Sequence, residues 1–246
     1  MKDFIKNIIR SFPIPLSQNH AYDLLTKKII KKVCHQSSYC IDVGCHKGEI
    51  MDIILRCAPE GHHTGFEPLP DFYTLLQNKY KKNPHVTIRN YALSDRKGQS
   101  TFNYVITNPA YSGLIKRNYD RQEKDTEIIV QTQTLDHLME NHPKIDLIKI
   151  DVEGGEYQVL LGAKSCLQRD KPVVIFEHGK GASEMYGTNP NDVFDYFETL
   201  DYKIFTLKSW LNSGPFFSKP AFSDEFYTGR NYYFVASHKD YDKSGK

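Results

Sequence analysis

Residues 145–163 read IDLIKIDVEGGEYQVLLGA and form the most informative stretch of the chain. The segment Ile145–Ile150 is mostly apolar, which predicts a strand buried on both faces of a parallel sheet. Asp151, Glu153 and Glu156 follow this strand closely. The dipole of a helix N-terminus favours acids, but this explains only one or two of the three. We therefore expect a functional site at the carboxyl end of this strand.

Short apolar strands alternate with helical segments on both sides of this stretch. Strands are expected over 39–43, 64–66, 86–89, 172–176, 202–207 and 232–236, and helices over 49–57, 72–80, 156–167 and 191–200. Such alternation is typical of a Rossmann-like α/β fold, with a mostly parallel sheet covered on both faces. The last two strands have no helical pattern between them, which predicts an antiparallel end to the sheet.

The segments outside this alternation suggest the domain organisation. Residues 1–38 form an expected N-terminal helical cap, with amphipathic patterns over 4–12 and 20–34, and residues 39–246 form the main domain. The first pattern fits a helix docked on the protein better than a helix lying on a membrane surface, although periodicity alone leaves both open. Residues 98–133 alternate apolar and polar in two runs, which predicts an inserted β-hairpin.

The first strand leads into the sequence IDVGCHKGE at 41–49. Asp42 ends the apolar run, Gly44 would let the backbone approach a ligand, and Gly48 would allow a tight entry into the next helix. The spacing D-x-G-x-x-x-G differs from the dinucleotide fingerprint G-x-G-x-x-G. It suits a ligand that lacks a pyrophosphate, such as S-adenosylmethionine, although two glycines may also serve only a turn.

The second strand ends in Gly-Phe-Glu-Pro at 65–68. A carboxylate at Glu67 can accept hydrogen bonds from both ribose hydroxyls, and Pro68 sets the direction in which the chain leaves the strand. The alternative is a surface acid before a turn. After the third strand, residues 90–95 lie where an adenine ring is expected. The candidate contacts there are Ala92, Leu93, Ser94 and Asp95, and ordinary turn chemistry is an equally good explanation.

Together these pieces resemble the FkbM family of S-adenosylmethionine-dependent methyltransferases. The matching sequences are IDVGCHKGE, GFEP, NYALSD, QTQTLD, LIKIDVEGGEYQVLLGA and VIFEH, in that order along the chain. The resemblance implies a seven-stranded methyltransferase fold whose last strand is antiparallel, and methyl transfer to a hydroxyl oxygen of a sugar or other small molecule.

The resemblance also assigns residues. It places Asp42, Gly44 and Glu67 in the cofactor site, and matches Asp151, Glu153 and Glu156 to the family's D-x-E-G-x-E, with Asp151 also beside the cofactor. Family members often have Ala-Asn-x-Gly after D-x-G. Here the loop is Cys-His-Lys-Gly at 45–48, so contacts by Cys45 and His46 are expected on position alone.

Methyl transfer to a hydroxyl is an in-line displacement that benefits from a general base. The candidate bases are Asp151, Glu153, Glu156, Glu177 and His178, and Glu177 is also a candidate acceptor contact. Several carboxylates near one hydroxyl could also bind Mg²⁺ or Ca²⁺, but no ligand set is identifiable from the spacing. The chain has no HExxH motif and no paired cysteines, so zinc is not expected.

The stretch 208–230 is rich in aromatic residues, including Trp210 and Phe217. Aromatic faces pack on sugar rings, so this stretch is a candidate acceptor platform in an irregular loop. A loop that covers the end of the sheet, or a contact between two copies of the chain, would have the same composition. A homodimer that forms through this segment is therefore the alternative to an acceptor platform.

Composition excludes several classes of partner. The 246 residues include 32 Lys and Arg against 30 Asp and Glu, a net charge of +2 that offers no grip on nucleic acid and fits a neutral acceptor. No apolar run is long enough for a membrane span. The five cysteines form no CxxC pair, which favours a reducing cytoplasm.

Three other functions remain as alternatives. An oxidoreductase of the Rossmann type would need the G-x-G-x-x-G loop that the chain lacks. A nuclease could use Asp151 and Glu153 for a metal, but a lysine is expected two positions beyond the second acid, where the chain has Gly155. A non-catalytic binding protein would not need the combination of Asp42, Gly44 and Glu67.

Overall fold

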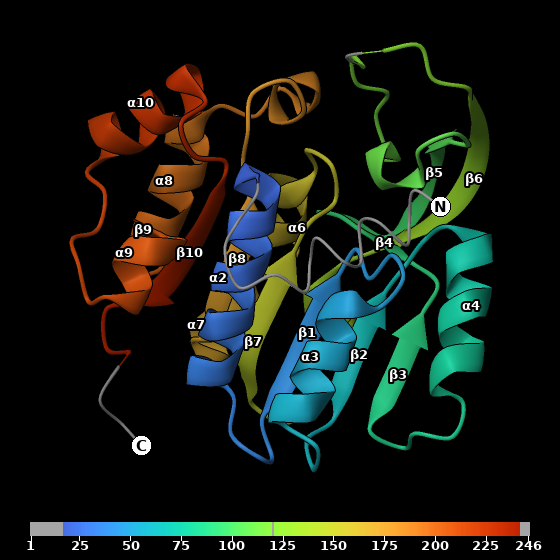
Figure 1. The fold of residues 1–246 in the computed structure, drawn as a ribbon, viewed down its shortest axis with the longest axis horizontal. Helices are drawn as coiled ribbons and strands as arrows, with labels where there is room; N and C mark the ends of the chain where they lie inside the picture. Colours follow the sequence, from blue (N-terminus) through green and yellow to red (C-terminus); the bar gives the residue numbers. More distant parts are fainter. Residues whose placement is uncertain (1–16, 120, 242–246) are drawn as a thin grey trace.

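A computed structural model describes residues 17–119 and 121–241 of the chain. Its centre is a seven-stranded sheet with the order β3-β2-β1-β7-β8-β10-β9 (Figure 1). The strands are β1 (Tyr39–Val43), β2 (His63–Phe66), β3 (Val86–Arg89), β7 (Ile145–Ile150), β8 (Val173–Glu177), β9 (Tyr202–Thr206) and β10 (Tyr233–His238). Neighbouring strands are parallel along the run β3-β2-β1-β7-β8, and β10 is antiparallel to both β8 and β9. The predicted fold class is confirmed.

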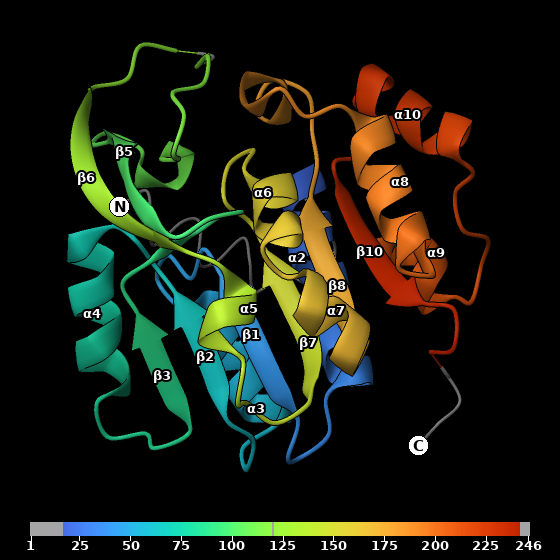
Figure 2. The same cartoon turned by 180° about the vertical axis from the view of Figure 1, so that it is seen from behind.

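Helices cover both faces of the sheet. The helices α2 (Gln18–Val33), α3 (Glu49–Cys57) and α9 (Leu207–Leu211) lie over one face (Figure 1). The helices α5 (Leu135–Leu138), α6 (Glu156–Leu161), α7 (Lys164–Asp170) and α8 (Pro190–Thr199) lie over the other (Figure 2). The helix α4 (Pro70–Tyr80) packs beside β3, and α10 (Lys219–Thr228) packs on α8.

Alternate residues of the central strands build two separate cores. In β7, Leu147 packs under α2 and α3, whereas Ile148 and Ile150 pack under α6 and α7. In β8, Ile175 belongs to the first core and Phe176 to the second. Successive strand residues point to opposite faces, so a strand buried on both sides is apolar almost throughout.

A second, three-stranded sheet extends beyond the carboxyl edge of the main one (Figure 1). The strands β5 (Gly98–Val105) and β6 (Asp125–Gln133) form an antiparallel hairpin, and β4 (Ala92–Leu93) pairs in parallel with the end of β6. The loop between β5 and β6 contains a 3₁₀ helix, Pro109–Tyr111, and folds back so that Gly113 bridges Asn103. This inserted hairpin therefore places its loop above the main sheet.

The structure differs from the sequence-based expectation in two helical regions. The segment 156–167 is divided between α6 and α7 at Gly162, where the chain passes so close to Ser94 that a side chain would overlap its carbonyl oxygen. The stretch 208–230 is not an irregular loop, since it contains most of α9 and all of α10. The helix expected over 4–12 lies outside the described residues.

None of the helices within the described residues is long and apolar enough to cross a membrane. The cytoplasmic location and the homodimer expected from the sequence stay predictions.

Trp210 provides a test of the core assignment. It is fully buried, and its indole N–H donates to the hydroxyl of Ser237 at 3.1 Å. We expect Trp210→Ala to lower the free energy of unfolding by about 3–5 kcal/mol, because truncation of a buried aromatic side chain leaves a cavity. Urea denaturation followed by circular dichroism measures this change. Phe216→Ala, at an exposed position, serves as the control and should change stability little. A stable Trp210→Ala protein would contradict the core role.

Candidate active site

A cavity of about 1610 Å³ lies at the carboxyl ends of β1, β2, β7 and β8. The order of the strands reverses between β1 and β7, because chain order runs outward from β1 to β3 on one side and from β7 onward on the other. Open parallel sheets bind their ligands at this switch point. The loops that follow the four strands, the inserted hairpin and the segment before β10 all contribute to the lining.

The loop after β1 depends on glycine at two positions. Gly44 has a φ of +83°, and a side chain there would overlap the carbonyl oxygen of Asp151. Its N–H and that of Cys45 donate to the carbonyl of Phe66 at 3.0 and 3.1 Å, which ties the loop to β2. Gly48 has a φ of +78° and packs against Tyr80 just before α3. Gly44, Cys45 and His46 line the cavity, whereas Gly48 only shapes the loop.

Glu67 joins the end of β2 to this loop. One carboxylate oxygen accepts the N–H of His46 at 2.8 Å and the other accepts the N–H of Leu69 at 3.0 Å. Burial raises the pKa of Glu67 to about 7, and the two backbone hydrogen bonds oppose this shift. Each oxygen retains a lone pair, so the carboxylate can still accept ligand hydroxyls. Glu67 and Pro68 both line the cavity.

Asp42 lies beneath the loop and is not part of the lining. Neither of its carboxylate oxygens has a hydrogen-bond partner among the described residues. Burial raises the pKa of Asp42 to about 6, while the charge of Lys149, its neighbour across β1 and β7, opposes the shift. Asp42 is thus placed below the lining of the cavity, and its expected contact with the cofactor stays a prediction.

The expected adenine contacts divide into two groups. Ala92 and Leu93 line the cavity, and so does the neighbouring Tyr91. Ser94 and Asp95 do not, because the chain turns away once the Ser94 N–H donates to the carbonyl of Gln133. The Ser94 hydroxyl donates to Asp95, whose side chain is exposed at the surface.

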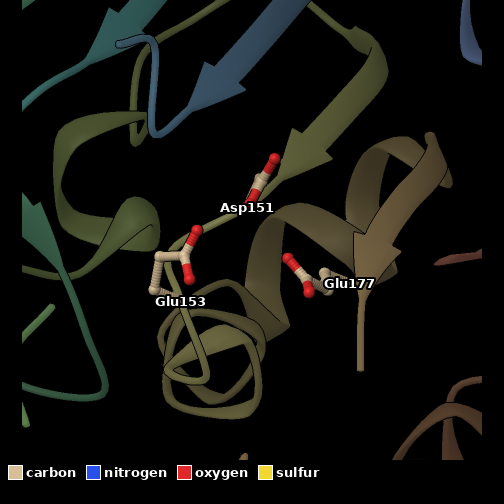
Figure 3. Close-up of side chains that lie close together, drawn as sticks. All are labelled: Asp151, Glu153 and Glu177. Carbon is tan, nitrogen blue, oxygen red and sulfur yellow. The ribbon is translucent and has the colours of Figure 1, made fainter. Parts of the chain in front are cut away.

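Three carboxylates meet at the centre of the site (Figure 3). Oxygens of Asp151, Glu153 and Glu177 all lie within 4.8 Å of one another, and we call this group the acidic trio. Asp151 accepts hydrogen bonds from the ammonium of Lys149 at 2.9 Å and from the hydroxyl of Tyr233. Burial opposes the ionisation of Asp151, but Lys149 and Tyr233 outweigh it and lower its pKa.

The other two members of the trio tend to hold protons. Burial and the charge of Asp151 raise the pKa of Glu153 to about 8, although Arg117 forms an ion pair with it and opposes the shift. Burial and the charges of Asp151 and Glu153 raise the pKa of Glu177 well above its ordinary value. Carboxylates this close cannot all be ionised at neutral pH.

Glu156 and His178 lie outside the lining. One oxygen of Glu156 accepts the N–H groups of Val152 and Gly154, so this buried side chain holds the turn that carries Glu153. Burial raises its pKa to about 7. His178 stacks on Phe226 with ring centroids 4.7 Å apart, and burial lowers its pKa to about 3. An imidazole with so low a pKa is a weak base, and the enclosed ring does not face the cavity.

The two aromatic residues expected to contact the acceptor also lie elsewhere. Trp210 is packed in the core under α2, and Phe217 packs against Phe222 and Phe234 in the core on the opposite face of the sheet. Both side chains lie outside the lining of the cavity. Of the stretch 208–230, the cavity is lined only by Phe226 and Gly229.

Sequence reasoning missed four residues of the site, namely Arg117, Lys149, Tyr186 and Tyr233. A signal for Lys149 exists, because a lysine in the middle of a buried strand requires a charged partner nearby. The other three come from the inserted hairpin, the loop after β8 and β10. Tyr186 accepts the N–H of Ile115 at 3.1 Å and so connects two of these segments. Their meeting depends on tertiary contacts.

The donor set at the acidic trio consists of oxygen atoms, the ligand type preferred by Mg²⁺ and Ca²⁺. Lys149 and Arg117 already form ion pairs with two of the three carboxylates. A divalent cation here stays a prediction.

The sheet order, the antiparallel β10 and a ligand loop without a pyrophosphate fingerprint define the class of Rossmann-like methyltransferases. The family model described as "Methyltransferase FkbM domain" matches residues 42–204, and the chain belongs to this family. The resemblance inferred from the sequence is thereby confirmed. Membership implies S-adenosylmethionine as the methyl donor, and it favours a methyltransferase over the oxidoreductase and nuclease alternatives.

Two relatives give further comparisons. The chain is 28% identical over 155 residues to "Hexuronic acid methyltransferase AglP" of Haloferax volcanii. The aligned region covers 62% of this chain and 58% of that protein. In the solved structure of methyltransferase FkbM from Methylobacillus flagellatus KT, the similar region covers 83% of this chain and 44% of that one, with 16% identity and a TM-score of 0.51. The chain thus spans about half the length of these relatives.

The residues of the cavity fit the implied cofactor. Gly44 lets the loop pass directly against the backbone of Asp151, where any side chain would overlap the carbonyl oxygen, and Glu67 offers acceptors for ribose hydroxyls beside this loop. We expect Gly44→Ala to weaken binding of S-adenosylhomocysteine at least about tenfold, because a side chain at this φ and this contact must displace the loop. Isothermal calorimetry measures the affinity. Gly98→Ala, where a side chain has room, is the matched control. Equal affinities for both variants would remove Gly44 from the cofactor site.

The pKa of Glu67 predicts a pH dependence of cofactor binding. The carboxylate accepts ribose hydroxyls best when it is ionised, so affinity for S-adenosylhomocysteine should be higher at pH 8 than at pH 6, with the change centred near pH 7. Glu67→Gln should bind more weakly and lose this pH dependence. Calorimetric titrations over this pH range provide the test. An unchanged profile in the variant would show that another group titrates.

Proposed function

We propose that this protein transfers a methyl group from S-adenosylmethionine to a hydroxyl oxygen of a sugar or related small-molecule acceptor. The observation that carries the proposal is the meeting of the Gly44 loop, Glu67 and the acidic trio around one cavity at the switch point of the sheet. The name of the relative AglP, a hexuronic acid methyltransferase, supports a sugar as acceptor.

The cavity has room for both reactants. Ligand sites commonly measure about 300–1,000 Å³, and this cavity of about 1610 Å³ is larger. The Gly44 loop, Glu67, Ala92 and Leu93 would hold the donor on one side of β7. The acceptor would then enter from the side of Glu177 and the inserted hairpin, so that its hydroxyl lies opposite the sulfonium for an in-line displacement.

Glu153 is the member of the trio best suited to act as the general base. Lys149 and Tyr233 hold Asp151 in its ionised form and make it a weaker base, and burial raises the pKa of Glu177 well above its ordinary value. The pKa of Glu153, raised to about 8, lies close to neutral pH, and a general base is most effective when its pKa is near the pH of the reaction. In this arrangement Glu153 takes the proton of the acceptor hydroxyl as the oxygen attacks the methyl carbon, and the bond from that carbon to sulfur breaks.

The assignment of the base predicts a pH profile. The rate should rise as the pH passes through about 8, because only the ionised form of Glu153 can accept a proton. Glu153→Gln should lower the rate by roughly 10²- to 10⁴-fold while leaving cofactor affinity intact. Transfer of labelled methyl groups to a panel of neutral and acidic saccharides measures both effects. Glu198→Gln, at an exposed position, is the control.

The proposed function itself has a direct test. Calorimetry should detect binding of both S-adenosylmethionine and S-adenosylhomocysteine, and labelled methyl groups should appear in at least one saccharide of the panel as a base-stable ether. Failure of both cofactor forms to bind would refute the methyltransferase proposal. Binding without methylation of any saccharide would refute the sugar acceptor.

A further inference from the structure

The lining of the cavity extends past the acidic trio to residues of α2 and of the segment that leads into β10. We call this the tyrosine arm. It is lined by Asn19, Tyr22, Asp23, Asn231, Tyr232 and Tyr233.

Three tyrosine rings form the wall of the arm. Tyr22 stacks on Tyr233 with ring centroids 5.3 Å apart and meets Tyr232 edge to face at 4.9 Å. Tyr22 is buried, whereas Tyr232 and Tyr233 keep part of their surface exposed. The wall is therefore a packed aromatic surface with its outer rings accessible from the cavity.

Hydrogen bonds fix the orientation of each ring. The Tyr22 hydroxyl accepts the side-chain N–H of Gln18 at 2.8 Å and the backbone N–H of Tyr232 at 3.3 Å. The Tyr232 hydroxyl donates to Asn19, and the amide of Asn231 donates to Glu225 at 2.8 Å. Because the rings are held in place before any ligand arrives, little conformational entropy is lost on binding.

The chemistry of the arm matches a saccharide. A pyranose ring presents an apolar C–H face, which packs on an aromatic ring, and a rim of hydroxyls, which needs short polar side chains. Asn19, Asp23 and Asn231 supply amide and carboxylate groups beside the tyrosine wall.

Tyr233 connects the arm to the reacting centre. Its hydroxyl donates to Asp151 of the trio, while its ring belongs to the tyrosine wall. The cavity is also continuous between the two regions. A group bound on the tyrosine wall is therefore adjacent to a group whose hydroxyl lies at the trio.

We infer that the tyrosine arm binds a second sugar unit, next to the one that is methylated, so that the acceptor is an oligosaccharide rather than a single sugar. This inference rests on the proposed function and narrows its substrate class. Tyr232 and Tyr233 are the binding surface for the second unit, Tyr22 packs against both rings and supports them, and the amide of Asn19 contacts its hydroxyls.

The test compares single sugars with longer ones on the full chain saturated with S-adenosylhomocysteine. Glucose is paired with cellotetraose, and glucuronic acid with a hyaluronan tetrasaccharide, and binding is measured by calorimetry and saturation-transfer NMR. In at least one series the tetrasaccharide should bind at least about tenfold more tightly than the single sugar. Saturation transfer should reach the protons of more than one sugar unit.

Variants of Tyr232 identify the surface responsible. Tyr232→Ala should remove the advantage of the tetrasaccharide and leave the affinities for the single sugar and for S-adenosylhomocysteine unchanged. Tyr232→Phe retains the ring and should keep most of the advantage. Tyr227→Ala, at an exposed tyrosine outside the cavity, is the matched control.

The inference is overturned if neither tetrasaccharide binds more tightly than its single sugar, or if the advantage survives in Tyr232→Ala. Its failure is distinct from failure of the proposed function. A protein that does not bind S-adenosylhomocysteine refutes the methyltransferase, whereas a protein that binds it without any gain from a longer saccharide refutes the tyrosine arm alone.

Discussion

The ammonium group of Lys149 is buried within the sheet and lies beside two carboxylates, that of Asp42 in the neighbouring strand β1 and that of Asp151 directly after β7. Burial disfavours the charge of Lys149, but these two carboxylates outweigh the effect and raise its pKa. An uncompensated buried charge costs several kcal/mol, so the three groups depend on one another. Because Asp151 is held in this way, the turn that follows it and the acidic trio have a defined position.

Around the group formed by Lys149, Asp42 and Asp151, segments far apart in the chain converge on one edge of the sheet. Gly44 brings the first loop against the backbone of Asp151, Arg117 reaches Glu153 from the inserted hairpin, and Tyr233 reaches Asp151 from β10. The trio thereby has two cations and a hydroxyl donor as neighbours. These neighbours are distributed unequally, so the pKa values of its three carboxylates differ. This inequality gives otherwise similar acids different chemical roles.

Local sequence controls several features of the candidate site, and these features occur in the structure at the expected positions. Glycines with positive φ, an acid at the end of β2 and acids after β7 follow from the chemistry of a strand, a turn and a helix start. The side to which each residue points was harder to predict. Glu177 and His178 are consecutive, yet one belongs to the trio and the other is enclosed by Phe222 and Phe226. Successive residues at the end of a strand face opposite sides, and a shift of one residue exchanges their environments.

The sequence by itself determined the alternation of strands and helices, the switch point, the donor loop and a concentration of acids at one strand end, because each is encoded by residues close together in the chain. Only the tertiary structure decided which acids share protons, that Asp42 lies beneath the cavity, that Trp210 and Phe217 are core residues, and that Tyr22 meets Tyr232 and Tyr233. Burial and charge pairing depend on contacts between distant segments, and local patterns carry no information about which segments meet.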